Sequence, residues 1–454
     1  MEAGLLDKRP PTGKINYDDL VPYEGERLIS ASIFSDEEIY RQELEGIFDR
    51  TWVFVAHESE MPNQNDFVSR YIGEDPVIVT HDLDGNFSVL LNSCSHRGPE
   101  VCRAEAGNAA IFRCPYHGWT YENTGELVGV MGERVVYGDR LDKSKLGLKR
   151  ARVASYHGLL FATWNEDAPS LEDHLGPFRY YLDLLFGLPD NGMEVIGPPQ
   201  RWVIPCNWKF GADNSSGDNY HVGVAHESLA MAAPGLQLDP ASTASRVFNI
   251  TDDRHGHSVT GFVQPDASMP REAWLDIASQ IGGIPPNIVP ELRAKLDENQ
   301  VETFLRTSAG VGNIFPNLAW IRTGSITAEG VPPQAAVSIR LWHPRGPNKT
   351  EVYAWTLVPR DAPEEVKLAA GEQMVRTFGI SGNFEQDDAD IWVGIQRATR
   401  GVQGRRRKLN YSVDGTPDET WPGPGVAYRN AIIDTNQWNF YVRWRDQLAS
   451  QHNK

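Results

Sequence analysis

The feature that most constrains this chain is a pair of short loops that each contain one cysteine and one histidine. The first is CSHRG, which holds Cys94 and His96, and the second is CPYHGW, which holds Cys114 and His117. Cysteine and histidine are common protein ligands of transition metals. Because glycine or proline lies beside each ligand pair, we expect two tight turns that bring the four side chains to one centre.

Two kinds of metal centre are compatible with two cysteines and two histidines. Structural zinc sites commonly group like ligands, as Cys-x-x-Cys and His-x-x-x-His, whereas each loop here holds one of each. In a Rieske [2Fe–2S] cluster two cysteines bind one iron and two histidines bind the other, so each loop can supply one ligand to each iron. The mixed loops therefore favour a Rieske cluster, with zinc and chance proximity as the alternatives.

The charge and the cysteine count exclude several classes of protein. The chain has 454 residues, a formal net charge of −18 and four cysteines. A chain this acidic is a poor ligand for nucleic acid or an anionic membrane, and so few cysteines do not make a disulfide scaffold. The sequence shows neither a signal peptide nor a run of about 18 apolar residues that could span a membrane. We therefore expect a cytoplasmic protein in which Cys102 and Cys206 are packed thiols.

The patterning divides the chain into three segments. Residues 1–49 comprise a polar arm and a helix, whose start is predicted at Ser35 by the capping box Ser35-x-x-Glu38. Residues 50–168 hold short strand-like runs separated by turn residues, which predicts a small all-β domain with the Cys/His loops at strand tips. Residues 169–454 mix helices and strands without βαβ alternation.

The predicted fold class is α+β, with the small all-β domain inserted in a larger domain to which residues 1–49 also belong. Within that large domain we expect adjacent antiparallel strands at 317–324, 335–344 and 350–359, flanked by helices. Helices are predicted near 213–228 and at 363–378, 384–398 and 428–448.

A second candidate metal site lies in DNSSGDNYHVGVAHES, residues 213–228. His221 and His226 are five residues apart, which places them about 140° apart on an ideal helix. Both could bind one metal only at a helix end or beside a π-type bulge. Two histidines and one carboxylate bind ferrous iron on one face and leave positions open for O₂. The spacing alone does not choose the carboxylate, and two buried, hydrogen-bonded histidines are the alternative.

The stretch CSHRG…CPYHGWTY resembles the Rieske domain of non-haem iron aromatic-ring-hydroxylating dioxygenases, in their large α subunit. FVAHESEMP, QRWVIPCNWKFGADN, RLWHPRGP and RTFGISGNFEQDD resemble the naphthalene/biphenyl-type branch of the same family. The resemblance covers nearly the whole chain after residue 35. It implies two cofactors, a Rieske [2Fe–2S] cluster and a mononuclear Fe(II).

The resemblance also implies roles for individual residues of this chain. The iron carboxylate matches Asp388 in FEQDDADIW, with Asp387 as the fallback. Asp218 matches the family's bridging aspartate, which is expected to connect His221 to His117 of a neighbouring chain. Asn214 matches the family's active-site asparagine.

The resemblance further implies an activity and partners. Electrons from NADH would pass through a reductase and a ferredoxin to the Rieske cluster, and then to the iron. There both atoms of O₂ would be added to an arene, a polycyclic arene or an aromatic carboxylate, to give a cis-dihydrodiol. The α subunits would form a ring of three, often with three small β subunits. The alternatives are a Rieske monooxygenase or O-demethylase, and an iron–sulfur protein that only transfers electrons.

The residues after Asn214 indicate an unusual substrate pocket. Ser215 and Ser216 stand where naphthalene-type relatives usually have a bulky apolar pair, whereas Phe378 and Phe384 match aromatic pocket positions. Small hydroxyl side chains would make room for a larger arene or hydrogen-bond a polar substituent. The alternative is that both serines cap a helix that begins here.

Overall fold

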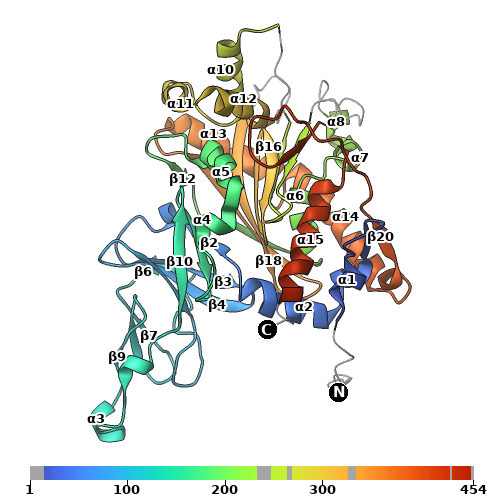
Figure 1. The fold of residues 1–454 in the computed structure, drawn as a ribbon. Coiled ribbons are helices and arrows are strands. Elements are labelled where there is room, and N and C mark those ends of the chain that lie inside the picture. Colours follow the sequence, from blue (N-terminus) through green and yellow to red (C-terminus); the bar gives the residue numbers. More distant parts are fainter. Residues whose placement is uncertain (1–14, 233–246, 263–267, 326–333, 430–431, 451–454) are drawn as a thin grey trace.

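The computed structural model describes residues 15–232, 247–262, 268–325, 334–429 and 432–450. It consists of a small β domain, blue to teal at the lower left of Figure 1, and a large domain in which helices surround an extended sheet. This mixed architecture confirms the predicted α+β class.

The small domain is built on two antiparallel sheets. The first has the strand order β2-β11-β10-β5-β4-β3-β6, and the second has the order β7-β8-β9. The strands of the first sheet are β2 (Val53–His57), β3 (Asp66–Ile72), β4 (Asp75–His81), β5 (Phe87–Leu91), β6 (Ala106–Asn108), β10 (Arg150–Tyr156) and β11 (Leu159–Thr163). Those of the second are β7 (Ile111–Arg113), β8 (Thr120–Glu122) and β9 (Leu127–Gly129).

Alternating side chains and tight turns explain why this segment forms hairpins. Along β3 (DFVSRYI) most apolar side chains are buried while Ser69 and Tyr71 are more exposed, as a strand with one covered face requires. Gly73 and Gly85 have φ values of +57° and +84° in the turns that follow β3 and β4. The strand-like runs predicted within residues 50–168 are therefore confirmed at β3, β4 and β5.

The large domain contains a nine-stranded antiparallel sheet. Its main path is β12-β19-β18-β17-β16-β15-β14-β21, and β13 also pairs with β19. The strands are β12 (Met193–Val195), β13 (Gln200–Ile204), β14 (Phe248–Thr251), β15 (Ser258–Gly261), β16 (Gly310–Ile314), β17 (Leu318–Ser325), β18 (Gln334–Pro344), β19 (Thr350–Pro359) and β21 (Val426–Tyr428). The predicted antiparallel group corresponds to β17, β18 and β19.

The longer helices cover this sheet and connect it to the small domain. They are α4 (Leu171–Leu175), α5 (Arg179–Phe186), α6 (Trp208–Ser215), α10 (Arg271–Ile281), α11 (Val289–Lys295), α12 (Glu298–Thr307), α13 (Glu364–Thr377), α14 (Asn383–Arg400) and α15 (Thr435–Ala449). Shorter helices are α1 (Tyr17–Leu20), α2 (Glu37–Glu43), α3 (Glu133–Val136), α7 (Val222–Ala225) and α8 (Glu227–Ala232).

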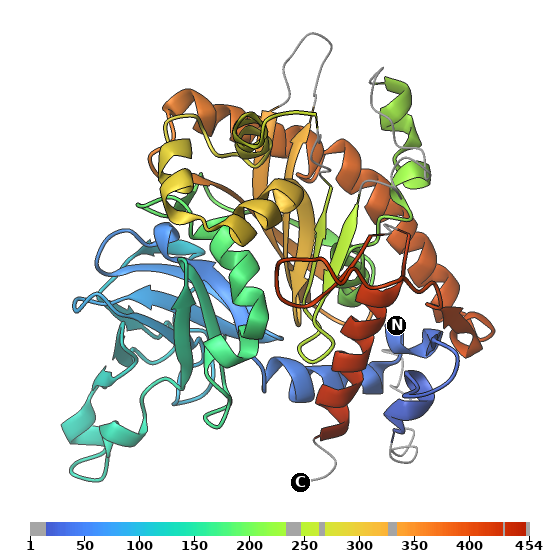
Figure 2. The same cartoon turned by 45° about the horizontal axis from the view of Figure 1, so that its top comes forward.

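The two faces of the large sheet pack against different elements. One face, which includes Trp320, Ile339 and Trp355, packs on α5 and on Phe54 of the small domain. Figure 2 shows α5 (green) between the small domain and the sheet. The opposite face carries Trp342 and is covered by α6, α14 and α15. The second face is the one on which the candidate iron ligands lie.

Three predicted helix boundaries are wrong. The side chain of Asp36, not Ser35, accepts the N–H groups at the start of α2, and the Ser35 hydroxyl donates to the carbonyl of Thr399 instead. The predicted helix at 213–228 is interrupted, because α6 ends at Ser215 and α7 begins only at Val222. The C-terminal helix begins at 435 rather than 428, since residues 426–428 form β21.

The N-terminal segment packs on the large domain, although the small β domain separates the two in the sequence. Strand β1 (Leu28–Ser30) pairs with β20 (Lys408–Asn410). At the end of α2 the buried Glu43 carboxylate accepts hydrogen bonds from the Lys209 ammonium at 2.5 Å and from the indoles of Trp208 and Trp444 at 2.8 Å. Such a buried ion pair is retained only with complete pairing, so it fixes α6 against the N-terminal segment.

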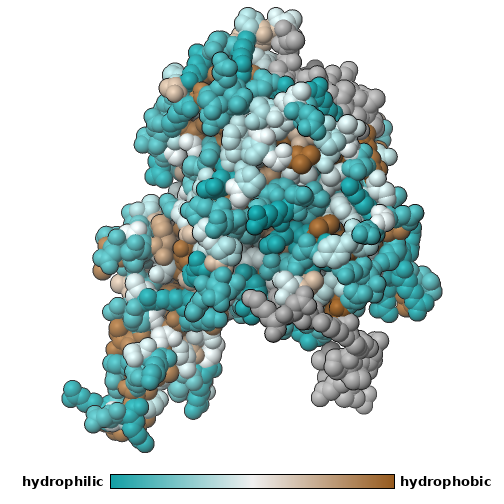
Figure 3. All heavy atoms as spheres, viewed as in Figure 1, coloured by the Kyte–Doolittle hydropathy of each residue, from teal (hydrophilic) through white to brown (hydrophobic). Residues whose placement is uncertain are grey.

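The surface is mainly hydrophilic on the face shown in Figure 3. Among the exceptions are Met131, Val135 and Val136 around α3, at the tip of the small domain, where Val135 is 92% exposed. Among the described residues, none of the helices has both the length and the hydropathy needed to cross a membrane.

Candidate metal centres

Both cysteine loops form the same turn, although their Cys–His spacings differ by one residue. In each loop the cysteine N–H donates to the carbonyl five residues later, and the cysteine carbonyl accepts from the glycine N–H four residues later, at 2.8–3.0 Å. Gly98 and Gly118 have φ values of +83° and +71°, a region that other residues rarely adopt. The two loops thus present Cys94 and Cys114 in equivalent positions.

The loops bring their ligands together with the cysteines inside and the histidines outside. The side chains of Cys94 and Cys114 are buried, while His96 and His117 are partly exposed, with ring centroids 4.5 Å apart. The Nδ1 atom of His96 is buried and makes no hydrogen bond to any part of the chain that the structure describes. A buried imidazole nitrogen without a partner fits a metal ligand, and the Cys₂His₂ donor set fits a Rieske cluster.

A tyrosine adjoins the sulfur ligand of the first loop. The Tyr121 hydroxyl lies 3.2 Å from Cys94 Sγ and accepts a hydrogen bond from the backbone N–H of Ser95 at 3.1 Å. Hydrogen bonds to the sulfurs of such a cluster are one of the factors that set its reduction potential.

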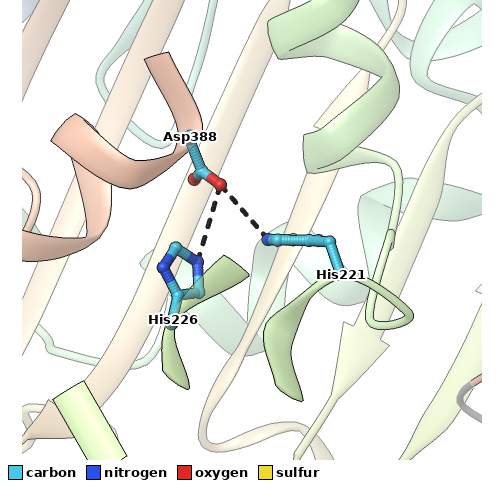
Figure 4. Close-up of side chains that lie close together, drawn as sticks. All are labelled: His221, His226 and Asp388. Carbon is cyan, nitrogen blue, oxygen red and sulfur yellow. Dashed lines mark ion pairs between the residues drawn. The ribbon is translucent and has the colours of Figure 1, made fainter. Parts of the chain in front are cut away.

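The second site is formed where three separate elements meet. His221 immediately precedes α7, His226 immediately follows it, and Asp388 lies in α14. Figure 4 shows the three side chains pointing at one another. Asp388 Oδ1 lies 3.3 Å from His221 Nε2 and 3.5 Å from His226 Nε2, and one ligand atom from each residue falls within 4.8 Å of the others.

This arrangement resolves the spacing problem of the two histidines. The five-residue separation works because the helix between them is a single short turn with a histidine at each end. Two imidazole nitrogens and one carboxylate oxygen on one triangular face are the donor set of non-haem Fe(II) oxygenases. The residues present therefore fit a mononuclear iron.

The neighbouring carboxylates have different geometries. Asp387 Oδ2 lies 3.2 Å from His226 Nδ1, the nitrogen that faces away from Asp388. Asp218 Oδ2 lies 3.4 Å from His221 Nδ1, and its side chain is 38% exposed. Both contacts have the form of the carboxylate–histidine pairs that orient metal ligands. Asn214 Nδ2 lies 3.4 Å from His221 Nε2, which places it at the same site.

The carboxylates set the protonation of His221 in the metal-free protein. Burial disfavours its charged form, but Asp218 and Asp388 outweigh burial and raise the pKa of His221 to about 10. A metal ligand must be a neutral imidazole, so iron binding displaces this proton.

A further carboxyl group adjoins the site, at Asp213. Its Oδ2 atom accepts hydrogen bonds from the hydroxyls of Tyr411 and Tyr441, both at 2.7 Å. Burial raises the pKa of Asp213 to about 7, although both hydroxyls act in the opposite direction. This group was missed by the sequence reasoning, because nothing in the local pattern connects residues 411 and 441 to residue 213.

The predicted pocket residues fall into two groups. The rings of Phe378 and Phe384 are stacked, with centroids 4.9 Å apart, and Phe384 lies 4.9 Å from the ring of His226. Ser215 and Ser216 instead end α6, which begins at Trp208, so they do not cap the start of a helix. The Ser215 hydroxyl accepts from the Trp342 indole at 3.2 Å, and the Ser216 hydroxyl donates to the Ala212 carbonyl at 2.8 Å.

We expect the protein to lose stability in mild acid because of its buried histidines. Burial lowers the pKa of His57 to about 4 and of His257 and His343 to about 3. Between those values and 6.5 the unfolded chain binds more protons than the folded protein, so each of these histidines destabilises the folded protein as the pH falls from 7.5 to 5.5. Asp213, with its raised pKa, offsets part of this loss. The decrease in stability should appear as a lower urea midpoint at pH 5.5 than at pH 7.5, and an unchanged midpoint would contradict it.

A chain with a Rieske-type loop pair and a two-histidine, one-carboxylate site belongs to the class of two-centre iron oxygenases. Comparison with known families agrees. Residues 51–137 match the family "Rieske [2Fe-2S] domain", and residues 179–449 match "Ring hydroxylating alpha subunit (catalytic domain)".

Individual relatives match over nearly their whole length. Biphenyl 2,3-dioxygenase subunit alpha of Rhodococcus jostii (strain RHA1) is 37% identical, over 99% of this chain and 95% of the relative. N,N-dimethyl phenylurea N-demethylase subunit alpha of Sphingobium sp. (strain YBL2) is 36% identical, over 93% and 92%. The crystal structure of naphthalene 1,2-dioxygenase from Rhodococcus sp. bound to indole is 43% identical and superposes with a TM-score of 0.86, covering 93% of this chain and 95% of that one.

The chain therefore belongs to the family of ring-hydroxylating dioxygenase α subunits, and it is a dioxygenase that carries a Rieske [2Fe–2S] cluster and a mononuclear iron.

Proposed function

We propose that this α subunit adds both atoms of O₂ to the ring of a small aromatic hydrocarbon or substituted arene, to give a cis-dihydrodiol. One observation supports this most directly. The three ligand atoms of His221, His226 and Asp388 converge beside the stacked rings of Phe378 and Phe384. An arene held against these rings would lie next to the iron.

The metal would activate O₂, and the side chains would position the iron, the ligand imidazoles and the arene. His221, His226 and Asp388 would hold the iron through two imidazole nitrogens and one carboxylate oxygen. Asp387 and Asp218 would orient the imidazoles of His226 and His221 through their Nδ1 atoms. The apolar rings of Phe378 and Phe384 would exclude water from the arene and hold it beside the three ligand side chains.

Electrons are proposed to reach this site from a neighbouring α subunit. The cluster loops lie in the small domain at the lower left of Figure 1, whereas α14 and α7 lie on the far side of the large domain. His117 and Asp218 are both partly exposed, so contact between two copies could place them together. We propose an α₃ ring, or an α₃β₃ hexamer with a small β subunit, that takes NADH-derived electrons from a reductase and a ferredoxin in the cytoplasm.

The second candidate is a monooxygenase reaction on the same two centres. It is favoured by one relative, the 36% identical N,N-dimethyl phenylurea N-demethylase subunit alpha. The product of such a reaction contains a single atom from O₂.

Product analysis under ¹⁸O₂ distinguishes these reactions. Purified protein, supplied with reductase, ferredoxin and NADH, is screened against arenes and aromatic acids for coupled O₂ uptake. Dihydroxylation predicts two labelled oxygen atoms in each product molecule. One labelled atom, with loss of an N- or O-methyl group, would establish the monooxygenase alternative.

A further inference from the structure

Two polar side chains in the centre of the large sheet have no hydrogen-bond partner. Ser258 of β15 and Asn313 of β16 are direct cross-strand neighbours, and both are fully buried. Neither the Ser258 hydroxyl nor either side-chain atom of Asn313 hydrogen-bonds to the described part of the chain. Buried polar groups are nearly always paired, because losing water without a substitute is costly. These groups therefore point to a bound molecule that is not part of the chain.

The register of the sheet places this pair on the side of the iron ligands. Asn313 is aligned with Ala319 of β17, and Ala319 with Arg340 of β18. Arg340 forms a 2.5 Å ion pair with Glu385 of α14, the helix that carries Asp388. The adjacent residue Gly312 faces Trp320 on the opposite face, as strand alternation requires.

The next row of the sheet connects the pair to the iron site. This row consists of Thr260, Val311 and Ile321. At one end a Cβ on Gly217 would lie 2.3 Å from Thr260 Oγ1, so the turn that precedes Asp218 rests on the sheet there. At the other end Ile321 packs against the buried cluster of Met374 and Phe378, on which Phe384 also packs.

Val311 lies between these two ends and is partly exposed. Asn313 is two residues further along the same strand and on the same face, about 7 Å away. The polar pair therefore lies on the same face as the row of Thr260, Val311 and Ile321, two residues further along β15 and β16.

The charges around the pair indicate a neutral ligand group. Arg340, the cation in the same row, is already paired with Glu385 and also donates to the Phe378 carbonyl. A carboxylate beside Asn313 would be buried without a free counter-charge, which is unfavourable. An amide and a hydroxyl can together both donate to and accept from an uncharged group.

We propose that Asn313 and Ser258 form a specificity subsite for arenes that carry a neutral hydrogen-bonding substituent, such as a ketone or a carboxamide. This inference rests on the proposed function, because it assigns the substrate class of the same site. Ser215 and Ser216 stay a separate candidate for the polar wall: the Ser215 hydroxyl accepts from the Trp342 indole, and the Ser216 hydroxyl donates to the Ala212 carbonyl.

The test measures dissociation constants for matched pairs of one- and two-ring arenes by calorimetry. Each pair has a carbonyl compound and its hydrocarbon isostere, for example acetophenone and α-methylstyrene. The wild-type protein should bind the carbonyl member more tightly, and Asn313→Leu should reduce that preference about ten- to hundredfold. Ser258→Ala, which removes little volume, should reduce it by a smaller factor.

The matched control is Ser338→Ala, because Ser338 is a buried serine on the same face whose hydroxyl donates to a backbone carbonyl. It should leave the preference unchanged. Equal binding of both members by the wild type, or equal losses for both members in Asn313→Leu and Ser258→Ala, would show that the pair binds only water and would overturn the proposal. A monooxygenated product from a carbonyl arene would instead refute the proposed dihydroxylation while leaving the binding preference intact.

Discussion

Asp388→Ala is expected to abolish arene oxidation and to lower the affinity for mononuclear iron by more than about 100-fold. Asp388 supplies the only carboxylate oxygen that faces the Nε2 atoms of both His221 and His226 among the residues described. Removing a direct ligand should cost more than the 10- to 100-fold typical of residues that orient a ligand. The iron content is measured after anaerobic purification, and the visible absorption of the Rieske cluster should be unchanged, because its loops lie in the other domain.

Asp387→Ala is the matched control for this experiment. Asp387 contacts the outer nitrogen of His226, so its loss should weaken iron binding by about 10- to 100-fold without abolishing it. If Asp387→Ala loses all iron while Asp388→Ala retains iron and activity, the two assignments are reversed.

Asp218→Ala is expected to retain both metals and to slow electron arrival at the iron by about 10- to 100-fold. The Asp218 carboxylate is 3.4 Å from His221 Nδ1, and its backbone partners are the N–H groups of Tyr220 and His221. The Asp218 carboxylate can therefore orient the His221 imidazole and, being 38% exposed, still contact a neighbouring chain. Stopped-flow oxidation of the reduced cluster measures the rate.

Asp218→Asn separates the two roles of this side chain. The amide preserves size and hydrogen bonding but removes the charge, so partial recovery of the rate relative to Asp218→Ala would show that geometry matters. An unchanged rate of cluster oxidation in Asp218→Ala would rule out the proposed bridge between subunits.

Short-range patterns in the sequence were sufficient for the cluster loops and for much of the fold. The Cys/His loops are tight turns at strand ends because glycine and proline determine backbone conformation locally. The strands β3, β4 and β5 and the group β17 to β19 follow from alternation and turn residues within single hairpins. Such signals require no knowledge of distant residues.

Helix boundaries around the iron site were less predictable. A continuous helix over 213–228 is compatible with local propensity, but the structure interrupts it between Ser215 and Val222. Gly217 has a φ of +121° and contacts the sheet so closely that no Cβ would fit. Packing against β14 and β15 therefore decides where the helix ends, which allows His221 and His226 to face each other.

The sequence by itself determined which residue types are available for two iron centres and suggested, through the family pattern, that Asp388 completes the second. Only the tertiary structure decided which side chains meet. It brings α14 next to α7 and aligns Ser258 with Asn313. It also places Asp387 against the Nδ1 atom of His226 and Asp388 against the Nε2 atom of His221. These contacts join residues that are tens to more than one hundred positions apart. They depend on sheet register and helix packing, which arise from the cooperative burial of the whole core and leave no local trace in the sequence.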